Sequence, residues 1–209
     1  MWNLYFLNNE YFLEAGTFNN TKTESEVFCF LNSNNDNCYF SRSDRFYDLS
    51  KKVGLIRKAV PEDMNEILRF GYDAWNEDRD MEAFLKSYES SMDHLTGQRY
   101  LIENNEEIIM ADLNTIRFSR DVVGIASVAC KPENRREGWI SKLLSAVILL
   151  LISENPRMKF LLFSEIEPDF YRRFGFYELP LQNFLPSVAM GRSESGFTMQ
   201  ELAFMNRYF

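Results

Sequence analysis

The sequence predicts an α/β fold of the mixed α+β type, with helices packed on a central mixed sheet. The run over residues 122–130 is almost continuously apolar, as expected of a buried strand. Residues 138–152 are apolar almost all round a helical wheel, which predicts a deeply packed helix. Along the chain the periodicity gives the order strand, helix, helix, three strands, helix, strand, helix, strand.

The first predicted strand, residues 54–58, leads into two amphipathic helices. Pro61, Glu62 and Asp63 favour a first helical turn, because proline and acidic residues suit that end of a helix. Apolar residues then recur at helical spacing: Met64, Ile67, Leu68, Tyr72 and Trp75, followed by Met81, Phe84, Leu85, Tyr88 and Met92. Strands are predicted over 99–103 and 107–118, joined by a tight turn.

After the buried strand, a polar loop over residues 132–136 leads into the long helix. A strand is predicted over 159–163, then a short helix over 168–174 that Gly175 closes. A further strand begins at Phe176. Thr198 and Glu201 have the spacing of a capping box, which predicts a terminal helix.

We divide the 209 residues into three parts. Residues 1–50 form an N-terminal extension rich in Asn and aromatic residues, for which short hairpins and a lack of regular structure are equally compatible with the sequence. Residues 54–182 form the main domain. Residues 183–209 form a strand and helix packed on that domain.

Composition and charge limit the classes of function and partner that we expect for this protein. The formal net charge of −8 argues against a nucleic-acid partner, because phosphate binding needs clustered Lys and Arg. No apolar run approaches the ~20 residues of a membrane span. The three cysteines, Cys29, Cys38 and Cys130, have no metal-site spacing, so we expect reduced thiols. We therefore expect a cytoplasmic protein without nucleic-acid or membrane partners, and leave a homodimer open.

The strand, loop and helix over residues 122–144 could hold a phosphate group. The first amides of a helix have no internal partner and carry partial positive charge. Gly138 permits close approach of the backbone to an anion, and Arg135 and Arg136 add charged donors. From physical chemistry alone, a surface turn with solvated arginines explains the same residues equally well.

Three segments resemble motifs of one family. Residues 132–144, PENRREGWISKLL, resemble the acyl-CoA loop of the GNAT acyltransferase superfamily. Residues 170–176, FYRRFGF, resemble its Phe-Tyr-x-x-x-Gly-Phe segment, and residues 56–63 resemble its opening strand and helix. GIASVA and LFSEIEPDFYRRFGF resemble most closely a subgroup that includes fungal lysine-acetyltransferase-like proteins. The resemblance implies a mostly antiparallel sheet of the GNAT type.

The resemblance also implies acetyl-CoA as co-substrate and N-acetyl transfer by direct attack of an amine, on a small molecule or a protein lysine. The pantetheine arm would bond to the strand's main chain at Val128, Ala129 and Cys130. The pyrophosphate would lie on the loop and helix start, which comprise Arg135, Arg136, Gly138, Trp139, Ile140 and Ser141.

The catalytic groups are expected around the later motif. The family's tyrosine, which protonates the leaving thiolate, corresponds to Tyr171, although a plain core role is the alternative. An amine with a pKa of about 10.4 needs a general base at neutral pH, and Glu165 is our candidate. Glu103 and Asp73 are the other candidates. Cys130 is expected to be a packing residue, and His94 a surface residue.

The loop departs from the family pattern at three positions. Arg136 replaces the first glycine, Ile140 replaces a small residue, and Glu137 adds negative charge. The rival hypothesis is therefore a GNAT-like fold that acts as a non-catalytic binding module. For the acceptor, Tyr72, Trp75, Asp78 and Arg79 could hold an amine by cation–π contact and charge, although core packing explains the two aromatic residues as well.

Overall fold

The computed structural model describes the backbone of residues 2–7, 10–15, 54–88, 96–104, 106–181 and 187–208. Side chains are described within 56–88, 96–104, 106–181 and 187–204. The predictions for Cys29, Cys38 and His94, and for most of residues 1–50, lie outside the described residues.

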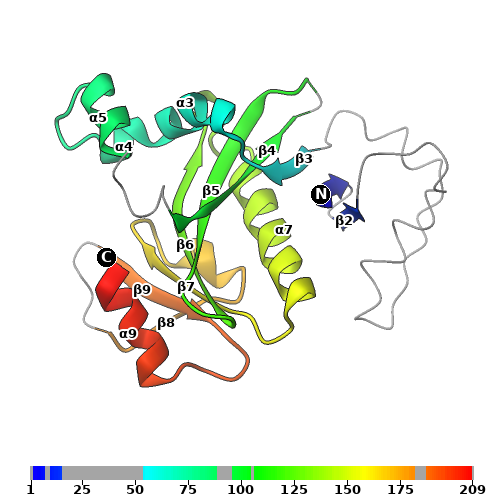
Figure 1. Cartoon of the computed structure of the whole chain (residues 1–209), viewed down its shortest axis with the longest axis vertical. Helices are drawn as coiled ribbons and strands as arrows, with labels where there is room; N and C mark the ends of the chain where they lie inside the picture. Colours follow the sequence, from blue (N-terminus) through cyan, green and yellow to red (C-terminus); the bar gives the residue numbers. More distant parts are fainter. Residues whose placement is uncertain are drawn as a thin grey trace.

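The described strands form one nine-stranded sheet in the order β2-β1-β3-β4-β5-β6-β7-β9-β8 (Figure 1). Their bounds are Trp2–Leu7, Glu10–Ala15, Gly54–Lys58, Gln98–Glu103, Ile109–Arg117, Val122–Cys130, Lys159–Ser164, Tyr177–Glu178 and Val188–Arg192, for β1 to β9. Among the described strands only β6 and β7 pair in parallel, and the other pairs are antiparallel. The mixed, mostly antiparallel sheet is therefore confirmed.

The helical segments are shorter and more varied than the sequence predicts before β4. The first predicted helix consists of η1 (Pro61–Asp63), α3 (Met64–Ile67), η2 (Leu68–Gly71) and α4 (Tyr72–Trp75). Its 3-10 turns end at Gly71, a residue type that weakens an α-helix. The remaining helices are α5 (Met81–Tyr88), η3 (Pro132–Asn134), α7 (Trp139–Glu154), α8 (Asp169–Arg172) and α9 (Met199–Tyr208).

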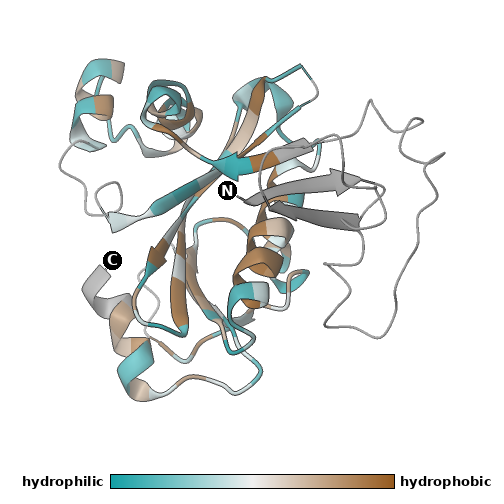
Figure 2. Cartoon of the chain, turned by 45° about the vertical axis from the view of Figure 1, so that its right-hand side comes forward, coloured by the Kyte–Doolittle hydropathy of each residue, from teal (hydrophilic) through white to brown (hydrophobic). Residues whose placement is uncertain are grey.

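Helices cover both faces of the sheet (Figures 1 and 2). The apolar side of α7 packs in the largest buried cluster with Tyr100, Leu113, Ile125 and Phe160 of the strands. On the other face, Ile67 and Phe70 pack with Leu101, Ile109 and Ala129. Leu202 of α9 joins a third cluster with Leu161 and Ala189. Because Phe160 and Leu161 are successive strand residues, α9 lies on the face opposite α7.

Several local predictions are confirmed by the contacts. The predicted strand over residues 122–130 is β6, and all of its first five residues are buried. The capping box is present, since Thr198 N donates to Glu201 Oε2 (2.7 Å) and Glu201 N donates to Thr198 Oγ1 (3.2 Å). Gly175 follows the short helix with φ +81°, a left-handed conformation that favours glycine. Within the described ranges no helix has the length and apolarity needed to cross a bilayer.

Candidate active site

The parallel strands β6 and β7 separate in the middle of the sheet. Their pairing covers only Val122–Gly124 against Lys159–Leu161. Beyond that point β6 stays paired with β5, where Ala129 lies opposite Asp112 and Cys130 opposite Ala111. The edge of β6 that carries the predicted pantetheine residues Val128, Ala129 and Cys130 therefore has no described β7 partner. The backbone N–H and C=O groups on this edge could form hydrogen bonds with an extended ligand, as they would with an added strand.

A bulge distorts β6 at the same place. The β5–β6 register shifts between Asp112 and Asn114, and Ser127 has φ +48°. A bulge increases the local twist and turns the backbone out of the regular ladder. It also changes the direction of the main-chain groups of β6 next to Val128, the first of the residues predicted to bond to the pantetheine arm.

The loop between β6 and α7 leaves backbone amides available. Arg136 and Gly138 have φ +67° and +88°. Gly138 precedes α7, whose first hydrogen bond across this boundary runs from Lys142 N to Gly138 O (3.0 Å). An added Cβ at Gly138 would meet no atom within 4 Å, so the space above the glycine is open. These amides, including those of Ile140 and Ser141, fit an anion site.

Trp139 and Ile140 are the first two residues of α7. Both are half-buried and pack against the core cluster under α7. No atom of Ile140 lies within 4 Å of the position that a Cβ added at Gly138 would take, so its branched side chain does not fill that space. Glu137 does lie at the helix start, where its Oε2 accepts from Trp139 Nε1 (3.0 Å).

Arg135 does not point to the loop amides. Its guanidinium makes a bidentate ion pair with Asp73, with Nη1–Oδ2 2.5 Å and Nη2–Oδ1 2.8 Å. Nη2 also donates to Phe70 O (3.1 Å). This pair lowers the pKa of the Asp73 carboxyl, chiefly through the hydrogen bonds from Arg135. Arg135 thus attaches the loop between β6 and α7 to η2 and α4, and Asp73 is a poor proton acceptor.

The two predicted catalytic residues both follow β7 in the chain, Glu165 directly after the strand and Tyr171 in α8. Tyr171 of α8 is 6% exposed and belongs to the cluster under α7. Burial, and secondly the charge of Glu165, raises the pKa of Tyr171 to about 12. Within the described part of the chain its hydroxyl makes no hydrogen bond. Tyr171 is therefore protonated at neutral pH, as a general acid must be.

Glu165 contacts a residue that packs on the α3 face of the sheet. The residue follows β7, is exposed, and accepts a hydrogen bond from Trp75 Nε1 (2.7 Å). The Trp75 ring packs on the cluster of the α3 face and lies directly over Gly71, where an added Cβ would be 2.1 Å from the indole. Of the predicted acceptor residues, Trp75 is the one that contacts a catalytic candidate; Tyr72 instead donates to Arg79 O (2.8 Å).

The remaining base and nucleophile candidates have structural partners. Glu103 Oε1 accepts from Arg57 Nη2 (2.5 Å), and Arg57 also pairs with Asp63, so the carboxylate is held in a network at the start of the domain. Burial raises the pKa of the Cys130 thiol to about 11. Cys130 Sγ lies 3.3 Å from Met110 O. Both residues fit packing and structural roles.

The sequence reasoning missed a buried charged pair near the bulge. Arg99 Nη1 pairs with Asp112 Oδ2, and the two residues are 6% and 0% exposed. Desolvation, partly offset by Arg99, raises the pKa of Asp112 to about 7. A signal for it exists in the sequence, because Asp112 interrupts the otherwise apolar run IIMADL.

Comparisons with known proteins agree with this geometry. The family model described as an acetyltransferase (GNAT) domain matches residues 55–179. A GNAT-family acetyltransferase from Staphylococcus aureus Mu50 is 22% identical, with TM-score 0.51, over 67% of this chain and 98% of that one. No curated protein matches the sequence.

Two further solved structures share the fold. The PaiA N-acetyltransferase from Thermoplasma acidophilum, solved in complex with coenzyme A, is 14% identical with TM-score 0.54, over 67% of this chain and 98% of that one. A chimera of the spermidine N-acetyltransferase SpeG from Vibrio cholerae and hSSAT is 13% identical with TM-score 0.53, over 72% and 98%. At these identities the likeness concerns the fold.

Proposed function

The chain belongs to the GNAT acetyltransferase family, and from this membership we propose that it transfers an acetyl group from acetyl-CoA to a primary amine. The observation that carries the proposal is the separation of β6 from β7 directly before a loop with open backbone amides. A strand edge and a helix start adjoin there, and together they suit an extended ligand with a phosphate group.

The residues present fit the cofactor. Val128, Ala129 and Cys130 would bond to the pantetheine arm through main-chain groups on the unpaired side of β6. The amides after Gly138 would hold the pyrophosphate. Acetyl-CoA, when bound, would supply the acetyl group as a reactive thioester.

The protein's own side chains would manage the protons. Glu165 would accept a proton from the incoming ammonium, because its carboxylate is exposed and fixed by Trp75. Tyr171 would give its Oη proton to the departing thiolate, since its raised pKa keeps the hydroxyl protonated. The charge of Glu165 contributes to that raised pKa, so the base also helps to keep the acid protonated.

We propose a cationic amine as the acceptor. Trp75 and Glu165 offer an aromatic ring and a carboxylate in direct contact, the two groups that bind an ammonium. The net charge of −8 would also attract a cation. One structural neighbour is a spermidine N-acetyltransferase, which is consistent with a polyamine or a lysine side chain here.

Steady-state assays on the full chain test the proposal. Acetyl-CoA is offered with spermidine or with a lysine-containing peptide, and thiol release and the mass of the acceptor are followed. We expect acceptor-dependent thiol release that falls in Tyr171→Phe but not in Tyr177→Phe, whose side chain is exposed. No release with any amine would contradict the activity. Equal rates in both variants would contradict the role of Tyr171.

A further inference from the structure

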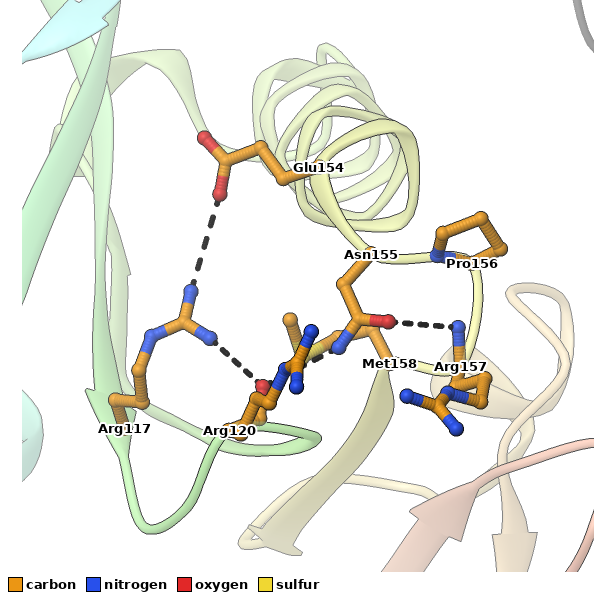
Figure 3. Close-up of a pocket in the computed structure, with 7 residues that line it drawn as sticks. All are labelled: Arg117, Arg120, Glu154, Asn155, Pro156, Arg157 and Met158. Carbon is orange, nitrogen blue, oxygen red and sulfur yellow. Dashed lines mark hydrogen bonds and ion pairs between the residues drawn. The ribbon is translucent and has the colours of Figure 1, made fainter.

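A cavity lies at the C-terminal end of α7 (Figure 3). Its volume is about 540 Å³, and the lining comes from the end of β5, the β5–β6 turn and the segment between α7 and β7. We call it the arginine pocket, because three of its seven lining residues are Arg117, Arg120 and Arg157. The other four are Glu154, Asn155, Pro156 and Met158.

Hydrogen bonds hold the walls of the arginine pocket in place. Asn155 Nδ2 donates to Arg120 O (3.2 Å) and to Asp121 Oδ1 (2.7 Å), which ties the two loops together. Asn155 Oδ1 accepts from Arg157 N (3.1 Å). Lys159 N donates to Asp121 O (2.8 Å) where β7 begins. The backbone on both sides of the cavity is therefore held by hydrogen bonds. This favours binding, because a ligand would not have to order the walls of the cavity and so would not pay that entropy cost.

The three guanidinium groups differ in their partners. Arg117 Nη1 donates to Arg120 O (3.2 Å), and its Nη2 forms a long ion pair with Glu154 Oε2 (3.8 Å). For the side chains of Arg120 and Arg157, the described residues provide no hydrogen bond or ion pair. Three cations face one lining carboxylate, in a chain whose net charge is −8. Such a local excess of positive charge favours an anionic ligand.

The lining limits the chemistry of that ligand. Pro156 and Met158 are its only apolar members and none of the seven is aromatic, so a nucleobase or an aromatic ring would find no stacking partner. A volume of about 540 Å³ is within the range of small-molecule sites. Guanidinium groups bind carboxylates and phosphates in bidentate fashion.

The arginine pocket is separate from the proposed acyl-CoA site. That site involves the N-terminal end of α7, whereas the arginine pocket is lined by Glu154, the last residue of α7. Since α7 has 16 residues, the two ends are about 24 Å apart. We propose that the arginine pocket is a binding site for a small non-aromatic polyanion, either a phosphate ester or a polycarboxylate.

An adjoining cavity extends the same charge. It has a volume of about 200 Å³ and shares Arg117 and Glu154 with the arginine pocket. Its other lining residues are Lys58, Thr96, Gln98, Tyr100, Thr115, Val123 and Leu151, of which only Lys58 is charged. A ligand with a second anionic group could reach Lys58 through it.

Calorimetric titration of the full chain tests the proposal, with inorganic phosphate and citrate as separate probes at low ionic strength. We expect saturable binding of at least one probe, and the tighter one indicates whether a phosphate ester or a polycarboxylate is the natural class. Arg120→Gln and Arg157→Gln should each weaken binding about tenfold, because each removes a charged donor. Arg69→Gln, an exposed arginine on η2, should have less than about a twofold effect.

Glu154→Gln should change the affinity for the probe in the opposite direction. Removing the one lining carboxylate should tighten binding several-fold, while Glu66→Gln, exposed on α3, should not. Circular dichroism establishes that each variant is folded. The absence of saturable heat with both probes would overturn the proposal, as would equal effects of Arg120→Gln and Arg69→Gln. Competition between phosphate and CoA would place the phosphate at the acyl-CoA site and overturn it too.

Discussion

The indole N–H of Trp75 donates to the carboxylate of Glu165 over 2.7 Å, across 90 residues of sequence. Trp75 belongs to the cluster on the α3 face, whereas Glu165 influences Tyr171 in the cluster under α7. The contact therefore connects the two faces of the sheet beside the separated strands. In the proposed reaction it fixes the base and adds a ring for the ammonium.

Removing the carboxylate of Glu165 should slow the reaction. Glu165→Gln keeps an acceptor for Trp75 but cannot take a proton at neutral pH, so we expect kcat to fall by about a hundredfold or more. Trp75→Phe loses the hydrogen bond and should mainly raise KM for the amine. The measurement is initial rate against amine concentration. Glu167→Gln, an exposed neighbour, is the matched control, and an equal loss there would remove Glu165 from the mechanism.

Tyr171→Phe should separate turnover from affinity. The hydroxyl makes no hydrogen bond within the described residues, so its removal should change the free energy of unfolding little. We expect kcat to fall by about a hundredfold or more while the Kd of acetyl-CoA stays within about twofold. Single-turnover rates and calorimetry measure the two quantities. A loss of affinity that matches the loss of rate would indicate a packing role.

Glu137 is expected to weaken cofactor binding. Its carboxylate accepts from Trp139 Nε1 at the start of α7, where a pyrophosphate would lie. Glu137→Gln keeps an acceptor and removes the repulsion, so we expect the Kd of CoA to fall about three- to tenfold. Glu133→Gln, exposed on η3, controls for a general change in charge. An unchanged or weaker affinity in Glu137→Gln would show that the pyrophosphate does not bind near Glu137.

Asp112 should make the stability depend on pH in the direction opposite to most carboxylates. Its pKa is raised by burial from 3.8 to about 7, so folding favours the protonated form. This contribution is fully present below the unfolded pKa and is lost as the pH rises towards about 7. Urea unfolding from pH 4 to pH 8 should show a decline that Asp112→Asn lacks and Asp78→Asn retains. A wild-type stability that rises relative to Asp112→Asn would contradict the raised pKa.

Much of the fold could be predicted, because its strongest elements are periodic and local. β6 and α7 follow from continuous apolar runs, and the cap of α9 follows from a spacing of three residues. The 3-10 turns before α4 could not be predicted, because apolar residues at helical spacing do not distinguish a 3-10 turn from an α-helical one. The early separation of β6 and β7 could not be predicted either, because the extent of strand pairing depends on tertiary structure.

The candidate site could be predicted in part. The sequence indicates the strand edge and the loop, and it places both Glu165 and Tyr171 after the strand that forms β7. Arg135 was assigned to the pyrophosphate, but its partner Asp73 is 62 residues away and no local pattern indicates the pair. Asp112 was missed although its charge interrupts an apolar strand, because the apolar periodicity alone was considered.

Titration of acetyl-CoA into the full chain by calorimetry tests the central claim most directly. We compare wild type with Gly138→Ala and Gly196→Ala, since both glycines have positive φ and open space around them but only Gly138 precedes α7. The account predicts saturable one-to-one binding with a thermal shift, weakened in Gly138→Ala and kept in Gly196→Ala. No heat and no thermal shift at millimolar acetyl-CoA would contradict it.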